Sequence, residues 1–153
     1  MTITTRPAAS RARWIALAAL TIWALVHVIG GITLLVADTN DGLETLGPNA
    51  AGTVPTDPGD AAEALLRFHS LNIALGGIGV LALTAAWWRT CNRWQLDIAV
   101  AVAAALDVGL IAFFVIPDVL PATQGLIGPV LVVIAIAGAI GVHRLQQPNP
   151  AIT

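Results

Sequence analysis

The stretch that decides the fold is WQLDIAVAVAAALDVGLIAFFVI, residues 94–116, which carries only two formal charges, Asp97 and Asp107. About 20 predominantly apolar residues in a helix are enough to cross the hydrocarbon core of a bilayer. Three other stretches of the chain have the same character, namely residues 14–37, 61–88 and 124–145. The sequence therefore predicts four transmembrane helices.

The composition of the whole chain agrees with this reading. Of the 153 residues, 57% are hydrophobic and 10% are charged, whereas a soluble domain carries roughly 25% charged residues. The chain has no lysine and a net charge of −2, which argues against nucleic acid as a partner because phosphate binding needs clustered basic groups. We predict an all-α integral membrane four-helix bundle that forms a single domain over residues 1–153, with the lipid bilayer as its main partner.

The arginines predict the orientation of this bundle. The connection of residues 38–60 has five acidic residues and no basic one, and the arginines near span ends lie before the first span, between the second and third, and after the last: Arg6, Arg11, Arg13, Arg89, Arg93 and Arg144. By the positive-inside rule both termini are cytoplasmic and the loop 38–60 is external. Trp14, Trp87, Trp88 and Trp94 fall at the same predicted cytoplasmic boundary, where indole rings are favoured. The expected location is the plasma (inner) membrane of a bacterium, as a multi-pass protein.

Several local features add expectations. The first apolar run is longer than the 7–15 residues usual in a signal peptide, so we expect it to be retained as a helix. The loop 38–60 is rich in Gly, Pro, Asn and Asp and should be irregular, with Asp60 as the N-cap of the next helix. Glu63 and Arg67 should form an ion pair at i, i+4, with Arg67 reaching the external interface. Pro129 should kink the fourth span.

Polar residues inside the spans are the candidate functional groups, because an ionisable side chain in hydrocarbon is costly and usually faces protein or water. At 1.5 Å per residue, His27, His69, Asn72 and Asp107 lie roughly 12–16 Å from the external ends of their helices. They come from three different helices but lie at one depth. We therefore predict a polar pocket, built from these four residues, in the external half of the bundle.

Such a pocket has several readings. The first is a site for an apolar or amphipathic small molecule, such as a lipid, a quinone or a sterol-like compound, or for a partner subunit in a homo-oligomer or larger membrane complex. The second is a membrane enzyme that uses Asp107 with His27 or His69 as acid and base, or as metal ligands, on a hydrophobic substrate. The third is a b-type haem or quinone electron-transfer subunit with the two histidines as axial ligands. Hydrogen bonds that only hold the helices together are an equally weighted reading of the cluster as a whole.

Short motifs add a resemblance to a known group. The second span opens with RFHSLN, residues 67–72, and continues with ALGG, residues 74–77, while PATQG, residues 121–125, precedes the last span. Together with four short spans and a long first external loop, these stretches resemble the small bacterial membrane proteins called BphX-like or DoxX-like. The resemblance implies a four-span bundle, but it implies no particular activity and carries over no catalytic residue.

Overall fold

The computed structural model describes residues 6–49 and 59–145, and the regular structure of these residues is helical. In chain order the elements are α1 (Arg6–Val36), α2 (Thr39–Leu46), α3 (Gly59–Thr90), α4 (Arg93–Leu110), the π-helix η2 (Ile111–Val115), α5 (Ala122–Gly125) and α6 (Ile127–Leu145). Four stretches of this part of the chain are long and apolar enough to cross a membrane: Ser10–Val36, Gly59–Thr90, Arg93–Val115 and Ala122–Arg144. The four predicted apolar helices are therefore confirmed, with ends that agree to within four residues.

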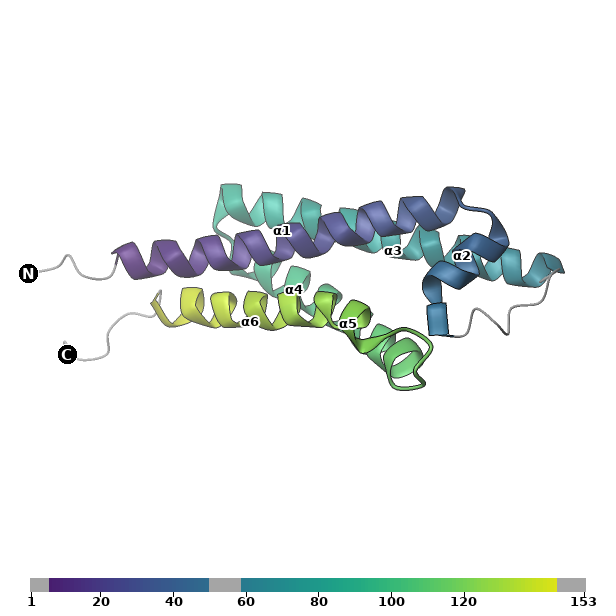
Figure 1. Ribbon diagram of the computed structural model, residues 1–153. Coiled ribbons are helices and arrows are strands. Elements are labelled where there is room, and N and C mark those ends of the chain that lie inside the picture. The colour runs from purple at the N-terminus through teal and green to yellow at the C-terminus, as the bar shows by residue number, and fades with distance from the viewer. Residues whose placement is uncertain (1–5, 50–58, 146–153) are drawn as a thin grey trace, which may run out of the picture.

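The long helices lie side by side in an up-and-down order (Figure 1). Helix α1 packs mainly against α3 and α6. Helix α4 also packs against both α3 and α6. The beginning of α1 and the end of α6 lie at one end of the molecule, and α2 and α5 lie toward the opposite end (Figure 1). Near the first end, His143 Nε2 of α6 and Asp97 Oδ1 of α4 are 2.8 Å apart.

Glycines allow the close approach of α1 to its neighbours. A Cβ on Gly31 would lie 2.6 Å from the backbone nitrogen of Ala74 in α3, and one on Gly138 in α6 would lie 2.8 Å from that of Ala16. Distances this short leave no room for a side chain. Small residues at helix contacts are typical of membrane proteins, because lipid provides no hydrophobic drive for helices to associate.

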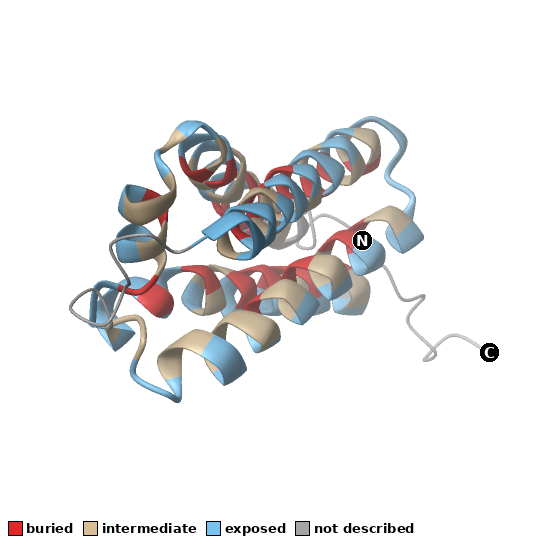
Figure 2. Ribbon diagram, turned by 90° about the vertical axis from the view of Figure 1, so that its right-hand side faces the viewer, coloured by how far each residue is buried: buried red, intermediate tan, exposed pale blue. Residues whose placement is uncertain are grey.

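Burial separates the faces of the helices into an inner and an outer set (Figure 2). The largest fully buried side chains include Trp23, Trp87 and Leu20. Many large apolar side chains are exposed instead, among them Ile29, Leu65, Phe68, Phe113 and Val133. An apolar surface of this extent requires an apolar solvent or partner.

The loop 38–60 differs from the expectation of an irregular segment. It contains α2, whose buried Gly42 packs against the side chain of Leu66 in α3. Residues 50–58 lie outside the described part. Helix α3 begins at Gly59, so Asp60 lies in the first turn of the helix and the prediction of an N-cap at this residue was wrong. Gly59 has a φ of 73°, outside the helical range, so this glycine and not Asp60 occupies the flanking position at the start of the helix.

The fourth span is interrupted at Leu126, three residues before Pro129. A proline has no N–H to bond the carbonyl oxygen four residues earlier, and its ring crowds that carbonyl, which here belongs to Gly125, the last residue of α5. The interruption therefore lies where the predicted effect of Pro129 falls. A second irregularity that the sequence pattern did not predict is η2, which continues α4. Trp87 also differs from the prediction, because it is only 2% exposed and lies below the guanidinium of Arg13, whereas Trp14 and Trp94 are about half exposed.

Candidate functional site

Two aromatic residues one helical turn apart form the base of the candidate site. Trp23 and His27 lie on the same face of α1, and their rings stack with centroids 3.7 Å apart. Nδ1 of His27 lies 2.8 Å from the carbonyl oxygen of Trp23. Since a carbonyl oxygen can only accept, Nδ1 carries a proton and donates it to this bond. The orientation of the imidazole is thereby fixed, with Nε2 directed away from its own helix.

Asp107 of α4 lies against these two side chains and is 3% exposed. The indole Nε1 of Trp23 donates to its Oδ2 at 3.0 Å, and its Oδ1 lies 3.8 Å from Nε2 of His27. Oδ1 is buried and has no hydrogen-bond partner. A Cβ on Gly128 of α6 would lie 2.7 Å from this oxygen, so the carboxylate occupies the space that a side chain at this position would fill. Asp107 thus joins α4 to α1 and lies directly on α6.

His27 also lines a cavity of about 310 Å³. It is bounded by α1, α3, α4 and η2, and its lining residues are His27, His69, Ile73, Ala105, Leu106, Gly109, Leu110, Phe113 and Phe114. The two histidines are the only residues in this set with polar side chains. Ala105 and Phe113 are exposed on the outer surface of the helices, so the cavity reaches the surface that an apolar solvent would cover.

The π-helix shapes one wall of this cavity. Its signature is the bond from the backbone N–H of Ile116 to the carbonyl oxygen of Ile111, five residues earlier, at 2.9 Å. Single π-helical turns inside α-helices occur frequently at functional sites. Here the turn contributes Phe113 and Phe114 to the wall, and the ring of Phe114 stacks on that of His69 with centroids 5.7 Å apart.

The structure brings some of the predicted pocket residues together and separates one. His27 contacts Asp107, and His27 and His69 line one cavity. Asn72 is exposed and does not line it. Depth along the helix groups Asn72 with His69, but a spacing of three residues leaves the two side chains about 60° apart around the helix. The separation is enough to turn Asn72 to the outer surface.

Trp23 is the polar partner that the sequence pattern missed. A buried indole N–H usually finds a hydrogen-bond acceptor. The spacing of four residues between Trp23 and His27, with Asp107 predicted at a similar depth, was the available signal.

The arrangement gives no support to a metal or haem ligand set. Among residues 6–49 and 59–145, no three His, Cys, Asp or Glu side chains lie close enough together to hold a metal ion. Both ring nitrogens of His27 already face oxygen atoms of the protein. An axial haem ligand would need one of them to present a free lone pair to iron.

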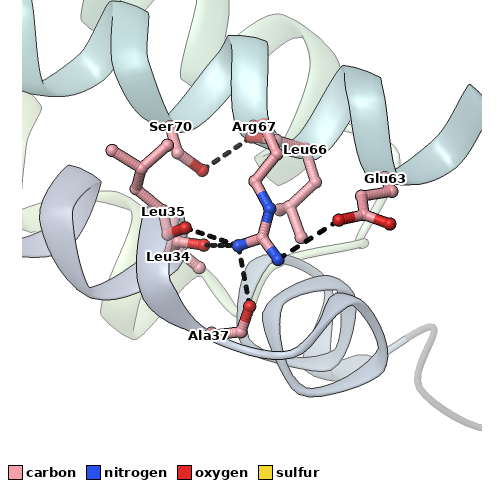
Figure 3. Close-up of polar contacts among 7 residues, drawn as sticks. All are labelled: Leu34, Leu35, Ala37, Glu63, Leu66, Arg67 and Ser70. Carbon is pink, nitrogen blue, oxygen red and sulfur yellow. Dashed lines mark hydrogen bonds and ion pairs between the residues drawn. The ribbon is translucent and has the colours of Figure 1, made fainter. Parts of the chain in front are cut away.

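Arg67 lies nearer the end of the molecule formed by α2 and has a role beyond the predicted ion pair (Figure 3). The pair with Glu63 is present, at 3.5 Å, and is confirmed. In addition, Nη1 of Arg67 donates to the carbonyl oxygens of Leu34, Leu35 and Ala37. These carbonyls belong to the end of α1, where a helix has no partners of its own to offer them. Arg67 therefore caps α1 from α3.

Comparison of the chain with protein-family models, curated proteins and solved structures finds no match.

Proposed function

We propose that this chain is a multi-pass protein of a bacterial plasma membrane that binds an amphipathic small molecule in the cavity beside His27 and His69. Its four long helices form a bundle with both termini on the cytoplasmic side. Two features support this orientation. Arg11, Arg13 and Arg144 lie at the end of the molecule where α1 begins and α6 ends, the acidic helix α2 lies at the opposite end, and positive charge is retained on the cytoplasmic side.

The observation that carries the proposal is the contrast between the apolar lining of the cavity and its two polar side chains, His27 and His69. The wall is apolar, with two phenylalanines and three large aliphatic side chains, and the polar groups are confined to two imidazoles. Binding sites for small molecules combine an apolar lining with a few placed polar groups in this way. The ligand is expected to place an apolar body against the phenylalanines and a polar group near the histidines.

The size of the cavity sets how much of the ligand it encloses. A volume of about 310 Å³ lies at the lower end of the range of roughly 300–1,000 Å³ found for ligand pockets. The cavity therefore encloses a small molecule or the headgroup of a longer one. For a longer ligand, the remainder would leave past the exposed Ala105 and Phe113 into the hydrocarbon of the bilayer.

The depth of the histidines agrees with such a ligand. His69 lies ten residues after Gly59, the first residue of α3, which places it roughly 15 Å from that end of the helix. A headgroup at this level is inside the outer half of the bilayer, below the lipid headgroups.

The test is to fill the cavity from a position that tolerates a side chain. Gly109 lines the cavity, and a Cβ there would have no neighbour within 4 Å, so Gly109→Leu should project into the cavity without disturbing the backbone. Gly79→Leu is the matched control, since Gly79 is exposed, has the same open space and lies away from the cavity. The measurement is mass spectrometry of the small molecules that remain with each purified protein.

We expect the wild-type protein and Gly79→Leu to retain the same molecule in near-stoichiometric amount. Gly109→Leu should lose it by roughly tenfold or more, since excluding a ligand from its pocket removes most of the contacts that hold it. Equal retention by all three proteins, or no molecule enriched above bulk lipid in any of them, would contradict the proposal.

A further inference from the structure

Asn72 is the one residue of the predicted pocket whose side chain lies on the outer surface of the molecule. Two other polar side chains within the spans have partners, since the hydroxyl of Ser70 donates to the carbonyl oxygen of Leu66 at 2.6 Å and the indole of Trp23 donates to Asp107. The amide of Asn72 has no hydrogen bond to any residue of the described part of the chain. It therefore presents two N–H donors and one acceptor oxygen on the outside of α3.

The position of Asn72 along α3 places this amide in the hydrocarbon of a bilayer. Asn72 lies 13 residues after Gly59 and 16 residues before Trp88, which is roughly 20 Å from the first and 24 Å from the second. The hydrocarbon core is about 30 Å thick, so an amide at this height above the tryptophan boundary lies within it. The side chain is too short to reach the interface as lysine and arginine do. Because an amide without a hydrogen bond is costly in lipid, Asn72 needs a partner.

Asn72 lies on the side of α3 that faces away from α1. Gly77 lies at the contact with α1, since a Cβ there would lie 2.8 Å from the carbonyl oxygen of Ala24. Gly79, two residues later, is rotated by about 200° around the helix and is exposed, with no neighbour within 4 Å of its Cβ position. Asn72 and Gly79 are seven residues apart and so lie within about 20° of each other. The outer face of α3 consists of these two residues and three exposed apolar ones: Phe68, Leu75 and Ala82.

We propose that the outer face of α3 binds a second copy of this chain, with the two Asn72 amides hydrogen-bonded to each other across a twofold axis along the bilayer normal. Two copies inserted in the same orientation hold Asn72 at the same depth, so each amide meets its counterpart. An amide carries both donors and an acceptor and is therefore complementary to itself, as a twofold contact requires. Hydrogen bonds of this kind join helices in membranes.

The other residues of the outer face suit a close contact between two copies of α3. Gly79 lies about two turns from Asn72 and has no side chain to hold the two backbones apart, which is typical of contacts between membrane helices. Phe68 and Leu75, which are 67% and 54% exposed, lie one turn on either side of Asn72 and would shield the paired amides from lipid. A different partner would have to carry a polar group at this same depth, a condition that a second copy meets by itself.

This inference rests on the membrane placement of the chain and not on its ligand. Neither Asn72 nor Gly79 lines the cavity, so formation of the dimer and retention of the ligand are separate properties. Gly79→Leu should accordingly keep the cavity ligand and weaken the dimer.

The first measurement is Förster transfer between copies of the protein in phosphatidylcholine vesicles as the ratio of protein to lipid is lowered. Cys91 is the only cysteine of the sequence and is exposed, so it can carry the donor or the acceptor dye. Asn72→Leu keeps the size of the side chain and removes the amide, so it should dimerise roughly tenfold more weakly than the wild type. Gly79→Leu should weaken the dimer by a similar factor. Gly30→Leu is the matched control, since Gly30 is exposed on α1 with the same open space, and it should dimerise as the wild type does.

The second measurement locates the contact. In a Cys91→Ala background, Leu75→Cys should form a disulfide-linked dimer on oxidation with copper phenanthroline, because residue 75 lies beside the proposed twofold axis. Ile29→Cys should not, although Ile29 on α1 is 63% exposed and Leu75 is 54% exposed.

Three outcomes would overturn the proposed dimer. They are a wild type that stays monomeric at every ratio of protein to lipid, an Asn72→Leu variant that dimerises as the wild type does, and cross-linking through Ile29→Cys but not through Leu75→Cys. None of them bears on cavity binding, which the retention of ligand by Gly109→Leu tests on its own.

Discussion

At the scale of single residues, Trp23 has the most consequential hydrogen bond in the site. It is fully buried, and its indole N–H satisfies one of the two oxygens of a buried carboxylate. The other oxygen, Oδ1, has no hydrogen-bond partner and lies 3.8 Å from Nε2 of His27. The indole of Trp23 is therefore the side-chain donor on which the carboxylate of Asp107 relies. Loss of this donor should measurably lower the free energy of unfolding.

Replacing Trp23 with phenylalanine tests this dependence. Trp23→Phe keeps an aromatic ring against His27 but leaves Oδ2 of Asp107 without a donor, which should reduce the free energy of unfolding by about 1–3 kcal/mol. The measurement is titration with SDS in mixed micelles. In the Asp107→Ala background the same substitution should cost clearly less, because the oxygen that it strands is gone. Equal costs in both backgrounds would show that the indole N–H does not support the carboxylate.

Arg67 provides a second prediction at this scale. Arg67→Met keeps much of the aliphatic length and removes the donor to three carbonyl oxygens at the end of α1, so it should destabilise the protein by about 1–3 kcal/mol. Glu63→Gln is the control, since it removes only the exposed ion pair, which should contribute less than about 1 kcal/mol. If the two variants lose equal stability in SDS titrations, the ion pair and not the cap is the important contact.

At the scale of the helices, the spans themselves follow from the distribution of charge. Charged residues end the apolar stretches within a few positions of the observed helix ends, because a charge in the hydrocarbon is costly wherever it falls. The departures from regular helices could not be read in the same way. The π-helix at Ile111–Val115 has no counterpart in the apolar pattern, and helix α2 depends on a contact with an element far away in the sequence, that of Gly42 with Leu66.

The contact between α1 and α3 yields a prediction with a matched pair of variants. A methyl group on Gly31 would meet the backbone of α3, whereas one on the adjacent Gly30 would have no neighbour within 4 Å. Gly31→Ala should therefore destabilise the protein by about 1–3 kcal/mol. Gly30→Ala should leave stability unchanged or raise it by up to about 1 kcal/mol through helix propensity. Equal effects in SDS titrations would show that α1 and α3 do not approach as closely as described.

At the scale of the whole molecule, part of the candidate site was predictable from the sequence and part was not. Depth along each helix is a one-dimensional quantity, so counting residues was enough to place His27, His69 and Asp107 near one level. Rotation about the helix axis and the packing order of the helices are three-dimensional. They decide that Asn72 is exposed, that Trp23 reaches Asp107, and that Asp107 does not line the cavity.

The orientation of the bundle can be tested with single cysteines. Cys91 is the only cysteine and is exposed in the connection between α3 and α4, so the proposed topology places it on the cytoplasmic side. Thr45, exposed in α2, should be external. In intact cells a membrane-impermeant maleimide should label Thr45→Cys in a Cys91→Ala background and spare the wild-type protein. Labelling of the wild type but not of the variant would reverse the orientation.

The most direct test of cavity binding is an experimental structure of the protein crystallised from a lipidic phase. Binding of an amphipathic molecule predicts density between His27 and His69, with a polar group near the two imidazoles and an apolar body extending past Phe113. A cavity closed by the side chains of Phe113 and Phe114, with His27 and Asp107 in their described contact and no density beside them, would contradict it.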